Sequence, residues 1–214
     1  MKFTLSILAL LAIAFLVGCS AKDTRDNKLS NSEITKLGKK YGGVYVFNKK
    51  FEKEIDDRER ERQELSQELG NKIRSNPRKI KNGNEYIIIY DIDMTPVDQK
   101  LPQILSNGKK YYTSTRSYEQ DYKKAVNVSK KYINEVINFI GQEDYNKFKP
   151  SIDIGYFYVD NDEIVPIELS ATYSYQGTKF GLFGDEGRGF ALSRDEIRYT
   201  KGGNRFYLED LERR

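Results

Sequence analysis

The spacing of hydrophobic and polar positions predicts three helices. Apolar residues recur at helical intervals through residues 30–41, 49–73 and 117–141. The last segment has the most regular pattern, and Gly141 stands where a helix of this length would end. We expect one long amphipathic helix there, because a single apolar stripe runs through Tyr118, Tyr122, Ala125, Val126, Ser129, Ile133, Val136, Ile137 and Ile140.

Local sequence signals mark where these helices begin. Ser30 with Glu33, and Ser117 with Gln120, have the spacing of a capping box. The middle of the second helix, residues 56–64, consists only of charged residues and Gln. A solvated peripheral helix is the simpler interpretation of this charge run, and a charged arm for a partner is the alternative.

Extended segments fill much of the remaining chain. Residues 44–47 form a short apolar run, and residues 78–93 contain Asn82-Gly83, a strong signal for a two-residue hairpin turn. Within that hairpin, residues 86–90 (YIIIY) are continuously apolar, so we expect a central strand buried on both faces. A second Asn-Gly pair, Asn107-Gly108, predicts another hairpin with residues 111–116 as its return strand.

From residue 152 onward the pattern becomes rich in strands. We expect strands over residues 152–159 and 164–175, a turn at Gln176-Gly177 into 179–183, and a hairpin of 197–200 with 205–208. Consecutive strands joined by short turns indicate antiparallel pairing. The predicted fold class is α+β: a mostly antiparallel sheet with the 117–141 helix packed on one face and the charged helix at the periphery.

The amino-terminal segment has the pattern of a secretory signal. Lys2 is followed by an almost wholly apolar run over residues 5–17. This run is shorter than the roughly 20 residues that a membrane-spanning helix needs. A basic start, a short apolar run and a small residue before a cleavage point are typical of a signal peptide.

The residues Leu16-Val17-Gly18-Cys19 resemble the lipobox of bacterial lipoproteins. The resemblance implies that a lipid joins the thiol of Cys19 and that cleavage falls before it, with no other cofactor. It also implies that Ser20 favours the outer membrane in a Gram-negative cell. The predicted organisation is a signal peptide over residues 1–18, the lipidated cysteine and a polar tether over 19–29, and one α+β envelope domain over 30–214.

Composition excludes several classes of function. The 214 residues include 36 Lys and Arg and 32 Asp and Glu, a balance too even to indicate a nucleic-acid partner. Histidine is absent, which excludes Ser-His-Asp and Cys-His catalysis and His-ligated metals. Cys19 is the single cysteine, so its lipidation would leave no thiol for a disulfide.

One set of carboxylates suggests an enzymatic alternative. Asp91 and Asp93 follow the apolar run 86–90 and resemble the first motif of haloacid-dehalogenase-like phosphatases. The resemblance implies a nucleophile at Asp91, an acid/base group at Asp93, and a magnesium site completed by Asp160 and Asp162. The hairpin pattern of the later strands counts against it, because that family has a parallel sheet.

A glycine-rich segment is the best candidate for partner binding. Residues 177–189 contain Phe180, Leu182 and Phe183 as apolar side chains and Arg188 as a possible charge anchor. Loops on a rigid sheet often carry function, and aromatic residues with arginine dominate interaction hot spots. An ordinary long hairpin loop is the alternative interpretation of this segment.

These observations favour a lipid-anchored envelope protein without enzymatic activity. We expect it to reach the membrane through the lipid on Cys19, with its domain in the periplasm or on the cell surface. There it would bind a protein or an envelope polymer, and a lipoprotein that neutralises a toxin or hydrolase is one concrete form. The magnesium-dependent phosphatase and a structural or assembly lipoprotein remain the alternatives.

Overall fold

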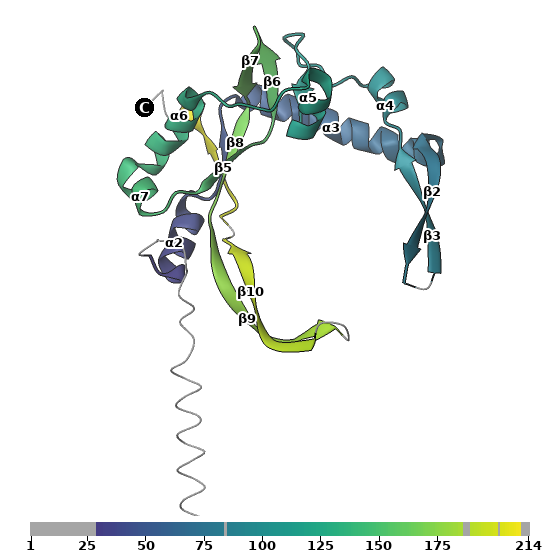
Figure 1. Cartoon of the computed structure of the whole chain (residues 1–214). Helices are drawn as coiled ribbons and strands as arrows, with labels where there is room; N and C mark the ends of the chain where they lie inside the picture. Colours follow the sequence, from purple (N-terminus) through teal and green to yellow (C-terminus); the bar gives the residue numbers. More distant parts are fainter. Residues whose placement is uncertain (1–28, 84, 186–188, 201, 211–214) are drawn as a thin grey trace, which may run out of the picture.

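The computed structural model describes residues 29–83, 85–185, 189–200 and 202–210 (Figure 1). This part of the chain is an α+β body from which two long β-hairpins project, so the predicted fold class is confirmed. The signal-peptide pattern, Cys19 and the polar tether up to Lys28 lie outside the described residues. Within them, no helix combines the length and apolar character needed to cross a membrane.

A four-stranded sheet forms the centre of the body. Its strands lie in the order β11 (Asn204–Tyr207), β1 (Gly43–Val46), β8 (Glu168–Thr172) and β5 (Ser151–Ile154). The pairs β1–β8 and β5–β8 are antiparallel, whereas β1 and β11 run parallel. The terminal strand therefore pairs with the first strand of the domain.

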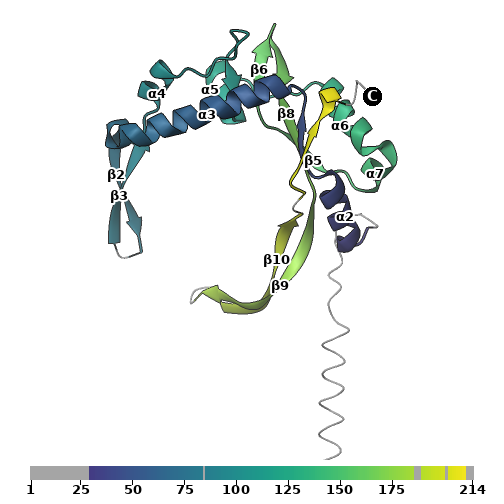
Figure 2. The ribbon, with the colours of Figure 1, turned by 180° about the vertical axis from the view of Figure 1, so that it is seen from behind.

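Three helices cover one side of this sheet: α2 (Asn31–Tyr41), α6 (Lys130–Ile140) and α7 (Gln142–Lys147) (Figure 2). The predicted Ser30–Glu33 capping box is present, and Gly42 ends α2. The helices and the sheet share the largest hydrophobic core. Its buried members include Ile34, Tyr41, Tyr45, Val136, Ile140, Phe148, Leu169 and Tyr173.

A three-stranded sheet stands beside the first, in the order β4 (Tyr111–Tyr112), β6 (Phe157–Asp160) and β7 (Glu163–Pro166). One side-chain cluster joins it to helix α5 (Thr115–Tyr122) through Tyr112, Tyr118, Phe157 and Ile164. A second cluster joins it to helix α3 (Lys49–Leu69) through Ile55, Leu105, Tyr111 and Ile167.

Helix α3 (Lys49–Leu69) is the longest element of the body. The Asn48 side chain accepts a hydrogen bond from the Phe51 backbone N–H at 2.9 Å, and Gly70 ends the helix with φ +49°. A 3₁₀ turn, η1 (Gly70–Ile73), leads into the first projecting hairpin, β2 (Arg74–Asn82) and β3 (Glu85–Ile92). Helix α4 (Thr95–Lys100) returns the chain to α3.

The charged middle of α3 is anchored rather than wholly solvated. Arg62 is buried and donates hydrogen bonds to the Asp98 carboxylate at 2.6 Å and to the Leu101 carbonyl. The Glu59 carboxylate accepts hydrogen bonds from Gln103 and from the Tyr111 hydroxyl. These contacts hold the segment after α4 against the helix.

The second projecting hairpin consists of β9 (Ser174–Asp185) and β10 (Gly189–Tyr199). Only Tyr173 separates β9 from β8, so this hairpin continues a strand of the central sheet into solvent. The chain then enters β11 and ends its described part in a 3₁₀ turn, η2 (Leu208–Asp210).

The continuous helix predicted over residues 117–141 is wrong in its extent. Helix α5 begins after Ser114, which caps it in place of Ser117, and it ends at Lys123, whose φ of 54° is left-handed. The second helix, α6, begins only at Lys130. The two helices pack in different cores, because Tyr118 lies in the cluster with Tyr112 and Val136 lies in the main core. The break between α5 and α6 allows each helix to pack against its own core.

Several predicted strands also differ from the structure. Residues 86–90 lie in β3, and both faces of that strand are largely exposed instead of buried. Gln176-Gly177 lies within β9 rather than in a turn, and residues 197–199 pair with β9 instead of with 205–208. The return strand after Asn107-Gly108 is only the two residues of β4. In each case the local pattern does not reveal which distant segment becomes the neighbour.

Candidate functional site

The β2–β3 hairpin exposes a row of large apolar side chains. Tyr86, Ile88, Tyr90 and Ile92 alternate along β3 and therefore share one face, and each is between 46% and 69% exposed. The opposite face adds Ile80 and Ile87, which pair directly across the two strands. A two-stranded ribbon has no second layer to cover such residues.

Basic side chains border this apolar row. Lys79 lies opposite Ile88 and Lys81 opposite Tyr86, while the Arg74 guanidinium lies 6.0 Å from the ring centroid of Tyr90. The register shifts between Ser75 and Arg78, so that Asn76 and Pro77 lie opposite Tyr90. Proline donates no ladder hydrogen bond, which accounts for a bulge at this point.

The β9–β10 hairpin carries a second apolar surface near its end. Phe180, Leu182, Phe190 and Leu192 are between 62% and 77% exposed. The register shifts between Ala191 and Ser193, so Leu192 faces two residues of β9, Gly181 and Leu182. A bulge of this kind bends a ribbon, and Figure 1 shows the last part of the hairpin running sideways from its base.

The predicted binding residues of segment 177–189 lie in this hairpin. Phe180 and Leu182 are exposed as the binding hypothesis requires, whereas Phe183 is half-buried, with the Arg194 guanidinium 4.8 Å from its ring centroid. Arg188 lies outside the described residues. The described part of the segment is β-ladder and not an irregular loop.

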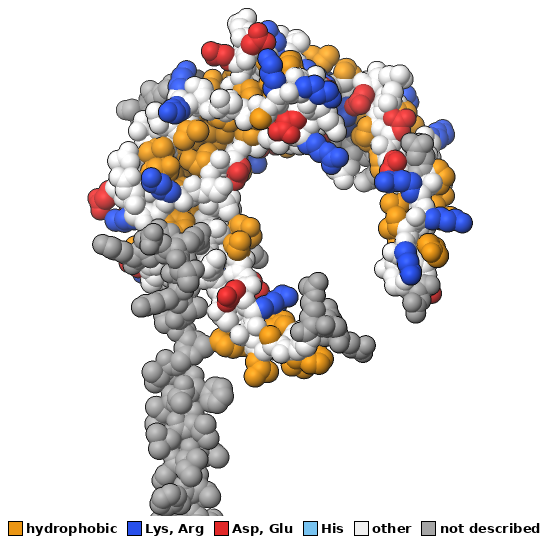
Figure 3. All heavy atoms as spheres, in the orientation of Figure 1, with side chains coloured by type: hydrophobic (Ala, Val, Ile, Leu, Met, Phe, Trp, Pro, Cys, Tyr) orange, Lys and Arg blue, Asp and Glu red, His pale blue; other side chains and the backbone are white. Residues whose placement is uncertain are grey.

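Together the body and the two hairpins border an open, concave side of the molecule, visible in the space-filling view (Figure 3). Apolar side chains are visible on both projecting parts in this view, with Lys and Arg side chains among those of the β2–β3 hairpin. The described residues thus expose two separated apolar surfaces, and the long helix α3 lies between their bases.

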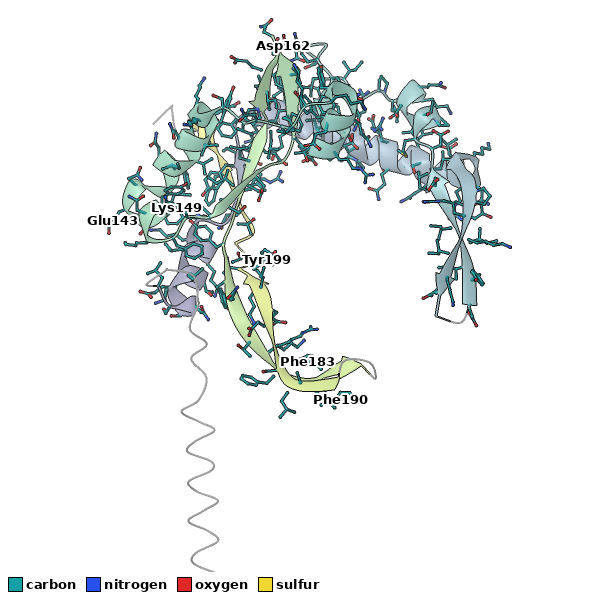
Figure 4. All side chains as sticks on the ribbon, in the orientation of Figure 1. Glu143, Lys149, Asp162, Phe183, Phe190 and Tyr199 are labelled. Atoms are coloured by element: carbon teal, nitrogen blue, oxygen red, sulfur yellow. The ribbon has the colours of Figure 1, made fainter. Side chains whose placement is uncertain are left out.

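The four carboxylates of the phosphatase hypothesis are not brought together. Asp91 accepts a hydrogen bond from Arg78 at 2.5 Å, and Asp93 accepts one from the Thr95 backbone N–H at 3.0 Å. Hydrogen bonds from the Thr95 side chain and from this N–H lower the pKa of Asp93. Asp160 pairs with Lys109 at 2.8 Å, and Asp162 occupies the β6–β7 turn at the far side of the body from the hairpin tips (Figure 4). Among the described residues, no three acidic or cysteine side chains are grouped as metal ligands would be.

A buried acidic cluster lies between helix α3 and the central sheet. Glu52 on α3 and Glu168 on β8 are both buried, and burial raises the pKa of each carboxyl, while Arg205 on β11 lowers it. Arg205 donates a hydrogen bond to Glu52, whereas one oxygen of Glu168, Oε2, has no hydrogen-bond partner among the described residues. The cluster joins helix α3 to two strands of the central sheet and has the character of a structural link.

Sequence reasoning missed the side chains that most define the two surfaces: Ile88, Tyr90, Phe190 and Leu192. A signal was available in β3, since its apolar residues face Lys79 and Lys81 across the hairpin. A strand buried on both faces would not have lysines as direct neighbours in its ladder.

No family model matches this chain, and neither a curated protein nor a solved structure is detectably similar to it. Only the chain's own residues therefore indicate what it does.

Proposed function

We propose that this chain is a lipid-anchored bacterial envelope protein without enzymatic activity that binds another macromolecule. The observation that carries the proposal is the uncovered row of Tyr86, Ile88, Tyr90 and Ile92 on the β2–β3 hairpin. Contiguous exposed apolar side chains on a soluble domain mark contact sites, and an open two-stranded ribbon also presents unpaired edges to a partner. The lipobox pattern ending at Cys19 supports the anchoring.

The charges on this hairpin favour an acidic protein as the partner. The hairpin carries four basic residues, Arg74, Arg78, Lys79 and Lys81, but only two acidic ones, Glu85 and Asp91, and Arg78 is already paired with Asp91. A surface with apolar side chains at its centre and cations at its rim fits a partner with an apolar strip flanked by Asp and Glu. Tyrosines are suited to such contacts because they supply a large area at a small entropic cost.

Site-specific photo-crosslinking in the native envelope tests this proposal. A benzophenone amino acid would replace Tyr90 on the hairpin or, as the matched control, Tyr122 on α5. These two tyrosines are similarly exposed, at 46% and 42%. We expect one discrete crosslinked protein at position 90 and none at position 122.

Charge reversal on the β2–β3 hairpin tests whether its cations favour an acidic partner. Lys79→Glu with Lys81→Glu reverses two exposed cations and should reduce the crosslink at position 90 by at least about tenfold, since rim charges control encounter and specificity. Equal crosslinking at positions 90 and 122, or a crosslink indifferent to the charge reversal, would contradict the proposed binding surface.

A further inference from the structure

The apolar surface near the end of the β9–β10 hairpin differs from the β2–β3 row in its surroundings. Phe180, Leu182, Phe190 and Leu192 cluster around the bulge, and Phe190 and Leu192 share a face because they are two positions apart in β10. Figure 4 places Phe190 on the underside of the bent part of the hairpin. The space-filling view shows apolar side chains along that underside.

The β9–β10 hairpin packs at its base against helix α2, the first helix of the described chain. Helix α2 contacts its base directly: a Cβ at Gly38 would lie 1.8 Å from the Thr200 hydroxyl oxygen, so the absence of a side chain permits the approach. Thr200 in turn donates hydrogen bonds from its backbone and its hydroxyl to the Tyr173 carbonyl, at 2.9 and 3.2 Å. In Figures 1 and 2 both α2 and the two hairpins lie on the side of the body opposite β6–β7.

The length of chain between Cys19 and the body limits how far away an anchoring membrane can be. About ten residues separate Cys19 from Leu29, and a fully extended chain of that length spans at most ~35 Å. A lipid on Cys19 would therefore keep the α2 side of the body close to the bilayer. The underside of the β9–β10 hairpin is on that side.

The charges near the apolar cluster fit a lipid headgroup layer. Lys179 lies directly opposite Arg194, one ladder step from the pair of Phe180 and Ser193. Two like charges in direct cross-strand register repel each other, and anionic headgroups would relieve that repulsion. Two acidic neighbours have partners within the hairpin, since Asp195 accepts a hydrogen bond from the Thr178 hydroxyl and Glu196 accepts one from Arg198.

We infer that the underside of the β9–β10 hairpin docks on the membrane that carries the lipid anchor. The apolar side chains Leu182, Phe190 and Leu192 enter the boundary between headgroups and acyl chains, and Lys179 and Arg194 lie at the headgroup level. The ribbon lies on the surface and does not cross it, because its unpaired edges could not be satisfied in the hydrocarbon layer. This inference rests on the lipid anchor of the proposed function.

Tryptophan fluorescence provides a direct test, because the chain contains no tryptophan. The full, lipidated protein would be reconstituted into vesicles of phosphatidylethanolamine and phosphatidylglycerol with brominated acyl chains, as single variants Phe190→Trp and Leu192→Trp. Ile104→Trp is the matched control, since Ile104 is an exposed apolar residue in the segment after α4. We expect a blue-shifted emission at positions 190 and 192, and bromine quenching at least about twofold stronger than at position 104, as for side chains at this depth.

Three other outcomes distinguish a failure of the docking from a failure of the lipid anchor. If the protein floats with the vesicles but position 192 is quenched no more than position 104, the docking is overturned and the anchor stands. A blue shift without quenching would show that protein covers the surface, either a second copy or another chain, and would also overturn the docking. If the protein does not float at all, both the anchor and the docking fail.

Vesicle composition tests the contribution of Lys179 and Arg194. Replacing phosphatidylglycerol by phosphatidylcholine should weaken the quenching at position 192, and Lys179→Gln with Arg194→Gln should have the same effect on vesicles that contain phosphatidylglycerol. Both substitutions are on exposed positions of the hairpin. If neither the lipid replacement nor the double variant weakens the quenching at position 192, the assignment of these cations to the headgroup layer is overturned.

Discussion

The guanidinium of Arg205 donates a hydrogen bond to the carboxylate of Glu52 across 153 positions of the sequence. Glu52 is only 3% exposed, and its neighbour Glu168 is buried as well. The contact closes the domain, because it ties the last strand to the first turn of the helix that supports the β2–β3 hairpin. It also supplies the positive charge that two buried carboxylates need.

Arg205→Met should therefore destabilise the fold. Removing Arg205 leaves the buried carboxylates without compensation. Because the Arg205 side chain is itself 43% exposed, we expect a loss of only about 1–2 kcal/mol in the free energy of unfolding at pH 8. The loss should shrink at pH 5, because protonation then neutralises carboxyls whose pKa burial already raises. Urea unfolding followed by circular dichroism measures both values. Arg198→Met, at an exposed pair with Glu196, is the control and should change stability little.

Glu168→Gln should act in the opposite direction at neutral pH. Burial raises the pKa of Glu168 in the folded protein. Above this raised pKa the buried carboxylate is charged and lowers the free energy of unfolding. Below the ordinary carboxyl pKa the group is protonated in both the folded and the unfolded state, and it then has no such effect. The variant should gain about 1 kcal/mol at pH 8, the scale of one unsatisfied buried oxygen, and nothing at pH 4. An equal effect at both pH values would show that packing, not charge, governs this position.

Arg62→Met should detach α4 from α3. Arg62 is buried against the Asp98 carboxylate and the Leu101 carbonyl, so its loss leaves an acceptor and a carboxylate unpaired. Because the Asp98 carboxylate is more than half exposed, we expect a cost of about 1–2 kcal/mol in the free energy of unfolding, with faster amide exchange over residues 95–101. Arg60→Met, two positions away at an exposed ion pair, is expected to leave both measurements nearly unchanged.

Asp144 gives the fold an acid-sensitive contact. Its carboxylate accepts hydrogen bonds from the Tyr41 hydroxyl at 2.7 Å and from Lys147 at 2.9 Å, which lower its pKa to about 2. The stabilisation is complete above the ordinary aspartate pKa and is lost as the pH falls through about 2. Asp144→Asn should lower the unfolding free energy by about 0.5–1 kcal/mol at pH 7 and have no effect at pH 1.5. A series of thermal melts between these pH values checks the sign, and Tyr41→Phe should abolish most of the difference.

The two hairpins should open without unfolding the body. Their ladders bury few side chains, whereas β1 and β8 pair within the main core. Amide hydrogens of β3 and of the outer half of β9 should exchange at least ~100-fold faster than those of β8, since local openings need only a fraction of the global free energy. Hydrogen exchange with peptide-level mass spectrometry measures this contrast. Protection of β3 equal to that of β8 in the isolated protein would indicate that a second copy already covers the hairpin.

Local chemistry was enough to predict several elements. The Ser30–Glu33 capping box marks the start of α2, the Asn82-Gly83 pair turns the β2–β3 hairpin, and the helical spacing of Phe51, Ile55 and Ile73 fits α3 with its 3₁₀ extension. Each of these signals acts over a few residues, so no knowledge of the rest of the fold was needed. The α+β class followed from them.

Burial and strand partners required non-local information. The residues Ile87, Ile88 and Ile89 have the composition of a central strand, but no layer packs over them. The pairing of β11 with β1 joins residues about 160 positions apart, with no signal in either segment. The same limit applies to the candidate surface, because exposure distinguishes a contact residue from a core residue only after the whole chain is placed.

The length of α3 sets the direction in which the β2–β3 hairpin points. Each residue inserted between Arg62 and Leu69 would rotate the hairpin by about 100° around the helix axis and shift it by about 1.5 Å. An insertion of about seven residues, close to two full turns, would return the Tyr86–Ile92 row to nearly its present orientation. The direction in which that surface faces is thus set by the number of residues in a helix that is not part of the surface.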